Sequence, residues 1–265
     1  KLYRPADAFE QSRVTRMEHV KTTIYETPKE GISGVANHIA NVIRQHDANG
    51  RNTVLSLASG RSMRDLFAEL VRLHKEEGLS FKNVIVFGSY EFYPLSDASL
   101  GSMAQIQSQL LDHVDIKTEN VYTFPLDLPR ETVFSFCEEY EKTIAQVGGI
   151  DIQVLGIGQC GNIAMNEPGT QANSSTRLVI LDNNSRSDAK ALFGNTTQVP
   201  VSAITIGIET ILQAKEVIMV AFGQHKAGIV KQAIESVAAT ACPASFLQLH
   251  KNASVVLDLD AANKL

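Results

Sequence analysis

The chain has 265 residues, of which 44% are hydrophobic and 20% are charged, and its formal net charge is -5 at pH 7. This composition is ordinary for a globular chain that buries a substantial core. The net negative charge, without any block of lysine and arginine, argues against nucleic acid and anionic membranes as partners. No apolar run approaches the roughly 20 residues of a membrane span, and the N-terminus lacks the apolar segment of a signal peptide.

Apolar, β-branched runs alternate with amphipathic segments along the chain. Residues 1–22 are polar and form an irregular N-terminal extension, followed by a short extended segment at 23–25. The runs that we predict as buried strands are 54–57, 84–87, 121–124, 152–155, 203–206, 217–222 and 254–257. The segments that we predict as helices are 29–45, 63–77, 100–113, 130–147, 185–193 and 225–237.

This alternation predicts a single α/β domain over residues 1–265, with a doubly wound, mostly parallel sheet and helices on both faces, as in Rossmann-like folds. The three cysteines, Cys137, Cys160 and Cys242, are odd in number and far apart, which favours a reducing, cytoplasmic setting over a disulfide framework. No residues stand at metal-ligand spacing on an expected helix or hairpin, so no metal or other cofactor is predicted. The chain begins at Lys1 rather than methionine, as a fragment of a longer chain would.

Ligands of such sheets bind beyond the carboxyl ends of the strands, so the residues after each strand are candidates for a site. Ser59, Gly60 and Ser62 follow the strand at 54–57 and open a helix. Glycine lets backbone N–H groups face an anion, and the helix dipole favours one there. An ordinary turn with Ser62 as the N-cap would give the same residues.

Three further loops carry charged side chains. Glu91 follows the second long strand among aromatic residues, where it is either a catalytic carboxylate with a raised pKa or a surface acid beside packed rings. Arg177 lies among small hydroxyl residues and suits bidentate phosphate binding, although a solvated arginine is the alternative. Lys226 lies in the first turn of an expected helix, against the helix dipole, which either a bound anion or a surface position would explain.

The segment GIGQCGNIAMNEPG, residues 156–169, follows the strand at 152–155 and has the form of an active-site loop. Glycines end the strand, and Glu167 stands beside a proline turn. The middle of the loop carries Cys160 and Asn162, where a proton-moving site would carry an acid and an imidazole.

Taken in order, these loops resemble the glucosamine-6-phosphate deaminase/isomerase family from about residue 23 to the end of the chain. The NEPG turn separates this branch from the 6-phosphogluconolactonases, which share the sheet but not that loop. The resemblance implies a Rossmann-like fold, a role in amino-sugar metabolism, a pocket for a small sugar phosphate and a tendency to form symmetric homo-oligomers. The segments that carry it most strongly are 148–151, 156–158, 163–169, 175–177 and 226–227.

The resemblance also implies roles for individual residues. The 6-phosphate would be held by the first loop, an arginine and a lysine, here Ser59, Gly60, Ser62, Arg177 and Lys226. The family's second loop glycine is Arg61 in this chain, and its proline is Met63.

The catalytic positions depart from the family pattern. Family members open the sugar ring with a carboxylate–imidazole group, move a proton between C1 and C2 with an aspartate, and release ammonia. Tyr90 stands at the aspartate position, Cys160 and Asn162 replace the acid and the histidine, and Glu167 is retained. A tyrosine with the ordinary pKa of ~10 is only about one part in a thousand ionised at pH 7, and asparagine cannot relay a proton.

Two functions therefore remain open on the sequence alone. The chain is either an enzyme that moves protons with Glu167 together with Glu91, Tyr90 or Cys160, or a non-catalytic sugar-phosphate-binding domain. In the second case it would act as a sensor or substrate-holding module for a fused or partner enzyme.

Overall fold

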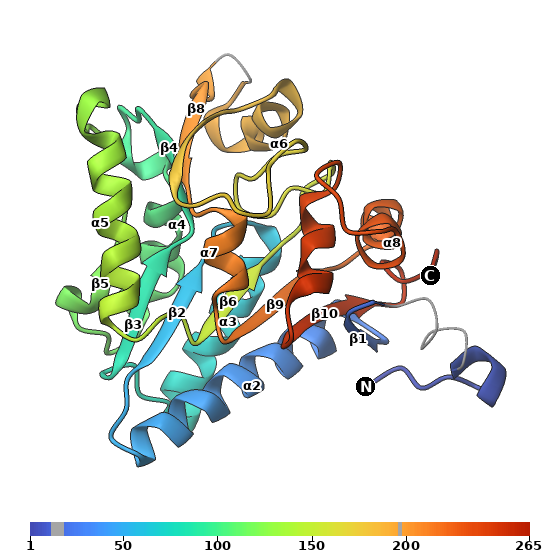
Figure 1. Cartoon of the computed structure of the whole chain (residues 1–265). Helices are drawn as coiled ribbons and strands as arrows, with labels where there is room; N and C mark the ends of the chain where they lie inside the picture. Colours follow the sequence, from blue (N-terminus) through green and yellow to red (C-terminus); the bar gives the residue numbers. More distant parts are fainter. Residues whose placement is uncertain (12–18, 196–197) are drawn as a thin grey trace.

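A seven-stranded, wholly parallel sheet forms the centre of the protein (Figure 1). The computed structural model describes residues 1–11, 19–195 and 198–265. The strand order is β1-β10-β9-β6-β2-β3-β5, so the chain winds outward in both directions from β2 and β6. The strands are β1 (Lys21–Tyr25), β2 (Thr53–Leu57), β3 (Val84–Gly88), β5 (Val121–Tyr122), β6 (Ile152–Leu155), β9 (Glu216–Ala221) and β10 (Ala253–Asp258).

Helices cover both faces of this sheet, which confirms the predicted fold class. On one face lie α2 (Pro28–Ala48), α3 (Arg61–Glu77) and α4 (Ser102–Gln109), packed over one apolar core. On the other face lie α5 (Val133–Gln146), α7 (Ile208–Leu212), α8 (Ala227–Glu235) and the 3-10 segment Pro243–Leu249, packed over a second core. In the described parts of the chain, no helix is long and apolar enough to cross a membrane.

A second sheet, of three antiparallel strands, was not predicted. It consists of β4 (Tyr90–Tyr93), β8 (Ser202–Thr205) and β7 (Arg177–Ile180), with β8 in the middle, and α6 (Asn183–Phe193) packs on it. The segment 203–206 was predicted as a buried strand of the parallel sheet, and this placement is wrong, because it pairs on both sides with antiparallel partners instead.

One residue between the sheets ties them together. The Ser89 N–H donates to the Leu57 carbonyl of the parallel sheet at 2.9 Å, and the Ser89 carbonyl accepts from the Ile206 N–H, just after β8, at 2.9 Å. The small sheet is therefore fixed against the carboxyl ends of β2 and β3, where the sequence analysis places the candidate loops.

The N-terminal segment and the strand ends differ from prediction in detail. Part of the predicted irregular extension, residues 12–18, lies outside the described residues. β1 begins at Lys21, inside that extension, and Leu2 forms a β-bridge with Tyr25. β5 ends at Tyr122 rather than Phe124.

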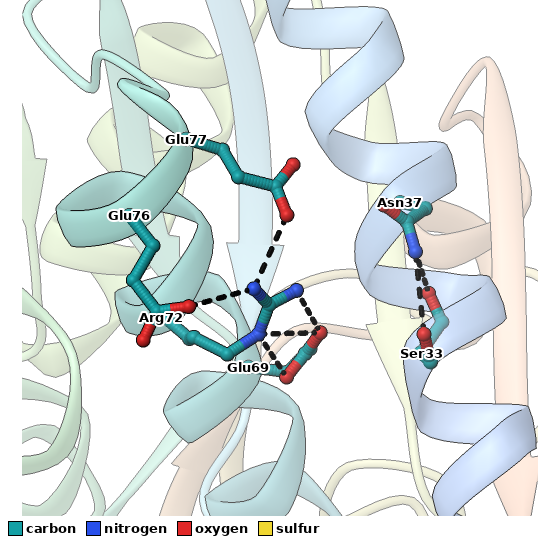
Figure 2. Close-up of polar contacts among 6 residues, drawn as sticks. All are labelled: Ser33, Asn37, Glu69, Arg72, Glu76 and Glu77. Atoms are coloured by element: carbon teal, nitrogen blue, oxygen red, sulfur yellow. Dashed lines mark hydrogen bonds and ion pairs between the residues drawn. The ribbon is translucent and has the colours of Figure 1, made fainter.

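Three of the four acids of α3 lie from its middle to its C-terminal end. Figure 2 shows Arg72 between three of them, at 2.8 Å from Glu69, 3.0 Å from Glu76 and 3.1 Å from Glu77. These exposed pairs stabilise the helix by only about 0.3–0.5 kcal/mol each. The first turn of α3 carries no acid, so the positive end of its dipole is not neutralised there.

Asp151 fixes the opposite, amino-terminal edge of the sheet. Its carboxylate is buried and accepts the Val54 N–H of β2 at 2.8 Å and the Lys215 ammonium at 2.7 Å. Because Asp151 immediately precedes β6, and Lys215 precedes β9, one side chain sets the relative position of three adjacent strands.

We predict that Asp151→Asn lowers the free energy of unfolding by about 2 kcal/mol, because a hydrogen bond to an ionised acceptor contributes roughly 1.5–3 kcal/mol. Urea unfolding would measure this. Asp65→Asn, at an exposed position on α3, is the matched control and should change stability by less than about 0.5 kcal/mol. Equal unfolding midpoints for both variants would contradict the role given to Asp151.

Candidate functional site

Three residues form one row across the small sheet. Tyr90 of β4 pairs with Thr205 of β8, and Thr205 pairs with Arg177 of β7. Directly opposed residues of antiparallel strands project from the same face, and adjacent strands lie about 5 Å apart. The row therefore presents a phenol, a hydroxyl and a guanidinium on one face over about 10 Å.

Each member of the row contacts a loop at the carboxyl edge of the parallel sheet. The Tyr90 hydroxyl lies 2.9 Å from Ser59 Oγ, in the loop before α3. Thr205 Oγ1 accepts the Met165 N–H at 3.1 Å, and Arg177 Nη1 donates to Asn166 Oδ1 at 2.9 Å. The small sheet thus holds both predicted site loops, at 58–62 and 156–169.

The start of α3 is open to an anion. Gly60 is the N-cap, with φ +141°, a backbone conformation that favours glycine, and no side chain caps the helix. Ser59 and Ser62 are partly exposed, and Arg61 is exposed beside them. Unsatisfied N–H groups, the helix dipole and a guanidinium together make this a position suited to a phosphate group.

Lys226 belongs to the same electrostatic group. Its ammonium donates to the Ile157 carbonyl at 2.7 Å. Burial lowers the pKa of Lys226; the Asp188 carboxylate opposes this effect and the Arg61 guanidinium adds to it. Lys226 and Arg61 are therefore close enough to interact, as two ligands of one anion would be.

Arg177, on β7, contacts a different set of residues. Its guanidinium donates to neutral acceptors, at 2.9 Å to Asn166 Oδ1, 3.2 Å to the Ser175 carbonyl and 3.4 Å to Thr170 Oγ1. Burial lowers the pKa of Arg177. No carboxylate pairs with Arg177 in the described ranges, so it is a further cation available to an anion.

The loop at 156–169 is tightly folded. The Gly158 N–H donates to the Asn162 carbonyl at 2.9 Å, and the Asn162 side chain lies over Gly158, where an added Cβ would be 2.0 Å from Asn162 Oδ1. Gly161, with φ +82°, packs against Cys242, and Ala164 adopts φ +49°, which is uncommon for a residue other than glycine. Asn162 therefore packs on its own loop.

Glu167 is engaged by the helix beyond the loop. Both of its carboxylate oxygens accept the Asp182 N–H, at 3.0 and 3.2 Å. Asp182 in turn caps α6, accepting the Ser185 N–H at 2.8 Å. Among the residues that the structure describes, no hydrogen bond joins the side chains of Cys160, Asn162 and Glu167, and Cys160 is partly exposed.

Glu91 has a structural role, because its carboxylate accepts backbone N–H groups at the start of α4. Its buried carboxylate accepts the N–H groups of Ser102 at 2.8 Å and Met103 at 2.9 Å, which begin α4, and that of Phe92 at 2.9 Å. Burial raises the pKa of Glu91, and these three donors oppose the shift. Since the carboxylate points into α4 rather than toward Tyr90, we do not place Glu91 among the groups that act on a ligand.

Asp188, which sequence reasoning passed over, brings an acid to the site. It projects from α6, accepts the Gln159 N–H of the loop and interacts with Lys226; burial raises its pKa, and this interaction opposes the rise. An exposed acid in the middle of a helix has the sequence pattern of an ordinary solvated residue. Its place at the site becomes evident only from the position of α6 in the fold.

The arrangement can bind an anion with several donors, but offers few free proton carriers. Glu167 is bonded to α6, and burial raises the pKa of Tyr90, which keeps the phenol protonated. Within the described part of the chain, no three histidine, cysteine or acidic side chains gather as metal ligands.

Comparison with known proteins identifies relatives over almost the whole chain. The family model for glucosamine-6-phosphate isomerases/6-phosphogluconolactonase matches residues 26–256. A glucosamine-6-phosphate deaminase-like protein of Bacteroides thetaiotaomicron is 47% identical over 266 residues, which cover 100% of this chain but only 40% of that protein. A glucosamine-6-phosphate deaminase of Pseudoalteromonas translucida is 36% identical, and the match covers 87% of this chain and 86% of that protein.

Solved structures with a similar fold include members of the same family. A monomeric glucosamine-6-phosphate deaminase of the NagB superfamily superposes with a TM-score of 0.87 at 31% identity, over 92% of this chain and all of that one. The 6-phosphogluconolactonase of Trypanosoma brucei superposes with a TM-score of 0.75 at 21% identity, over 93% of this chain and 98% of that one, a likeness of fold alone.

We predict that Glu91→Gln lowers the free energy of unfolding by about 2 kcal/mol, because one acceptor oxygen becomes an amide that faces backbone N–H donors. Chemical denaturation would measure it, with Glu138→Gln, at an exposed position of α5, as the control. If Glu91→Gln were as stable as the control, the structural role of Glu91 would be contradicted, and Glu91 would again be a candidate catalytic group.

Proposed function

Because the chain belongs to the family of glucosamine-6-phosphate isomerases and 6-phosphogluconolactonases, we propose that it binds a small sugar phosphate, glucosamine 6-phosphate in the first instance. The observation that carries the proposal is the uncapped start of α3, which begins with Arg61, together with the electrostatic interaction between Arg61 and Lys226. Relatives of comparable length have names that specify this sugar phosphate.

In this proposal the phosphate lies on the segment Ser59–Ser62. The hydroxyls of Ser59 and Ser62 and the backbone at Gly60 donate to its oxygens, and Lys226 and Arg61 supply the charge. Arg177 was assigned to the same phosphate on sequence grounds. Its separate partners make it the weaker candidate, and the variants below distinguish the two assignments.

We propose further that the domain holds or senses its ligand, and that deamination is the second candidate function. The engagement of Glu167 with α6 and the protonated Tyr90 support the first. The retained Glu167 and Asp188 support the second, since one is a carboxylate of the loop at 156–169 and the other contacts that loop at Gln159. The greater length of the Bacteroides thetaiotaomicron relative supports action together with an attached or partner enzyme, which we place in the cytoplasm.

We predict that Lys226→Ala weakens the binding of glucosamine 6-phosphate about 30-fold, as charge-assisted hydrogen bonds contribute roughly 1.5–3 kcal/mol and 1.4 kcal/mol is tenfold. Arg177→Ala should have less effect if Lys226 and Arg61 hold the phosphate. Titration calorimetry would measure both affinities.

Lys251→Ala, an exposed lysine at the amino-terminal edge of the sheet, is the control and should bind like the wild type. If only Arg177→Ala lost affinity for glucosamine 6-phosphate, the phosphate would have to be assigned to the small sheet instead. Unchanged affinity in both variants would remove the basis for the proposal.

The changed proton carriers give a second prediction. The triple variant Tyr90→Asp, Cys160→Asp, Asn162→His should raise kcat for deamination at least about tenfold at saturating substrate, a cautious fraction of what one general base contributes. Single replacements should recover little, because such groups act as a unit. Ammonia release, measured on all four variants, tests this.

Wild-type turnover at about 10 per second, a typical enzyme rate, would contradict the interpretation of these positions as losses. In that event the protons must be moved by other groups, with Glu167 and Asp188 as the first to replace.

A further inference from the structure

We propose that Tyr90 is a positioning residue that fixes the phosphate loop, Ser59–Ser62, and orients the Ser59 hydroxyl toward the ligand. This inference rests on the proposed function, because it concerns the same loop. It gives the phenol a task other than proton transfer.

The contact joins a rigid element to a loop that lacks its own support. Tyr90 is the first residue of β4, where it pairs with Thr205, and the preceding Ser89 is hydrogen-bonded to both sheets. Gly60 in this loop has a positive φ of +141°, which favours glycine, and no side chain caps α3. The 2.9 Å contact between the Tyr90 hydroxyl and Ser59 Oγ is thus a support supplied from outside the loop.

The phenol ring itself is held in place. It meets the Phe92 ring edge-on with centroids 6.0 Å apart, and Phe92 meets Phe193 of α6 in the same way at 5.1 Å. Aromatic pairs at these distances and angles are favourable. The fixed ring directs the hydroxyl to Ser59 Oγ, and the Ser102 side chain is its second polar neighbour.

The direction of the hydrogen bond follows from the ligand. A serine hydroxyl has one hydrogen and two lone pairs. To donate its hydrogen to a phosphate oxygen, Ser59 must accept from another donor, and the Tyr90 hydroxyl, which burial keeps protonated, is the donor in contact. Successive hydrogen bonds of this kind strengthen one another.

A carboxylate at position 90 would act in the opposite sense. It accepts but does not donate, so it would compete for the Ser59 hydrogen, and its charge would repel a phosphate in the loop. Tyrosine at position 90 therefore favours phosphate binding, although it does not supply the general base that an aspartate would.

A double-mutant cycle tests the proposal. Inorganic phosphate and glucosamine 6-phosphate are titrated against wild type, Tyr90→Phe, Ser59→Ala and the double variant. Tyr90→Phe should weaken both affinities about three- to tenfold, the range of one net hydrogen bond, and should cause less than about a twofold change in the Ser59→Ala background. Tyr93→Phe is the matched control: it removes a hydroxyl of the same strand that donates to the Leu128 carbonyl, and affinity should not change.

Two results would overturn the proposal. One is an effect of Tyr90→Phe that is as large without the Ser59 hydroxyl as with it. The other is unchanged affinity for both ligands with a lowered kcat, the signature of a proton carrier. If the wild type binds neither ligand, the proposed function fails independently of this inference. The same cycle is then measured as free energies of unfolding in urea. Additive losses of stability refute the contact between Tyr90 and Ser59 as a support of the loop, and non-additive losses uphold it.

Discussion

A parallel sheet brings the carboxyl end of every strand to one edge, and this protein builds its site where a second sheet is fixed against that edge. The hydrogen bonds of Ser89 to Leu57 and Ile206 impose this position. The row from Tyr90 to Arg177 can reach the loops before α3 and after β6 only because the small sheet is held there. The site thus depends on a junction of two sheets more than on any one loop.

The strands of the parallel sheet could be predicted because their residues are buried on both faces and form short apolar runs. The small sheet could not. The segment 203–206 has the same apolar composition as a central parallel strand, and composition does not identify the partner strand. β4 and β7 are four residues each and begin with Tyr90 and Arg177, which were interpreted as loop residues with functional side chains.

The site was predictable at the level of loops, but not at the level of contacts. Gly60 and the serines around it indicated either an anion site or an ordinary turn capped by Ser62, and the structure has Gly60 as the N-cap without a side-chain cap. The environment of Glu91 could not be predicted in this way, because two of its three donors are the first residues of a helix eleven and twelve residues later. The contacts that Asp188 and Arg177 make depend on where α6 and β7 lie, which no local pattern specifies.

The link between Glu167 and Asp182 has a consequence for how information could pass through the molecule. One carboxylate both belongs to the loop at 156–169 and holds the first turn of α6, while Asp188 on the same helix reaches back to Gln159. A cation or proton that binds Glu167 withdraws charge from the oxygens that accept the Asp182 N–H, so binding at Glu167 weakens its hydrogen bond to the residue that caps α6. By reciprocity, a change that breaks the hydrogen bond between Glu167 and Asp182 strengthens the binding of that cation or proton to Glu167 by the same factor.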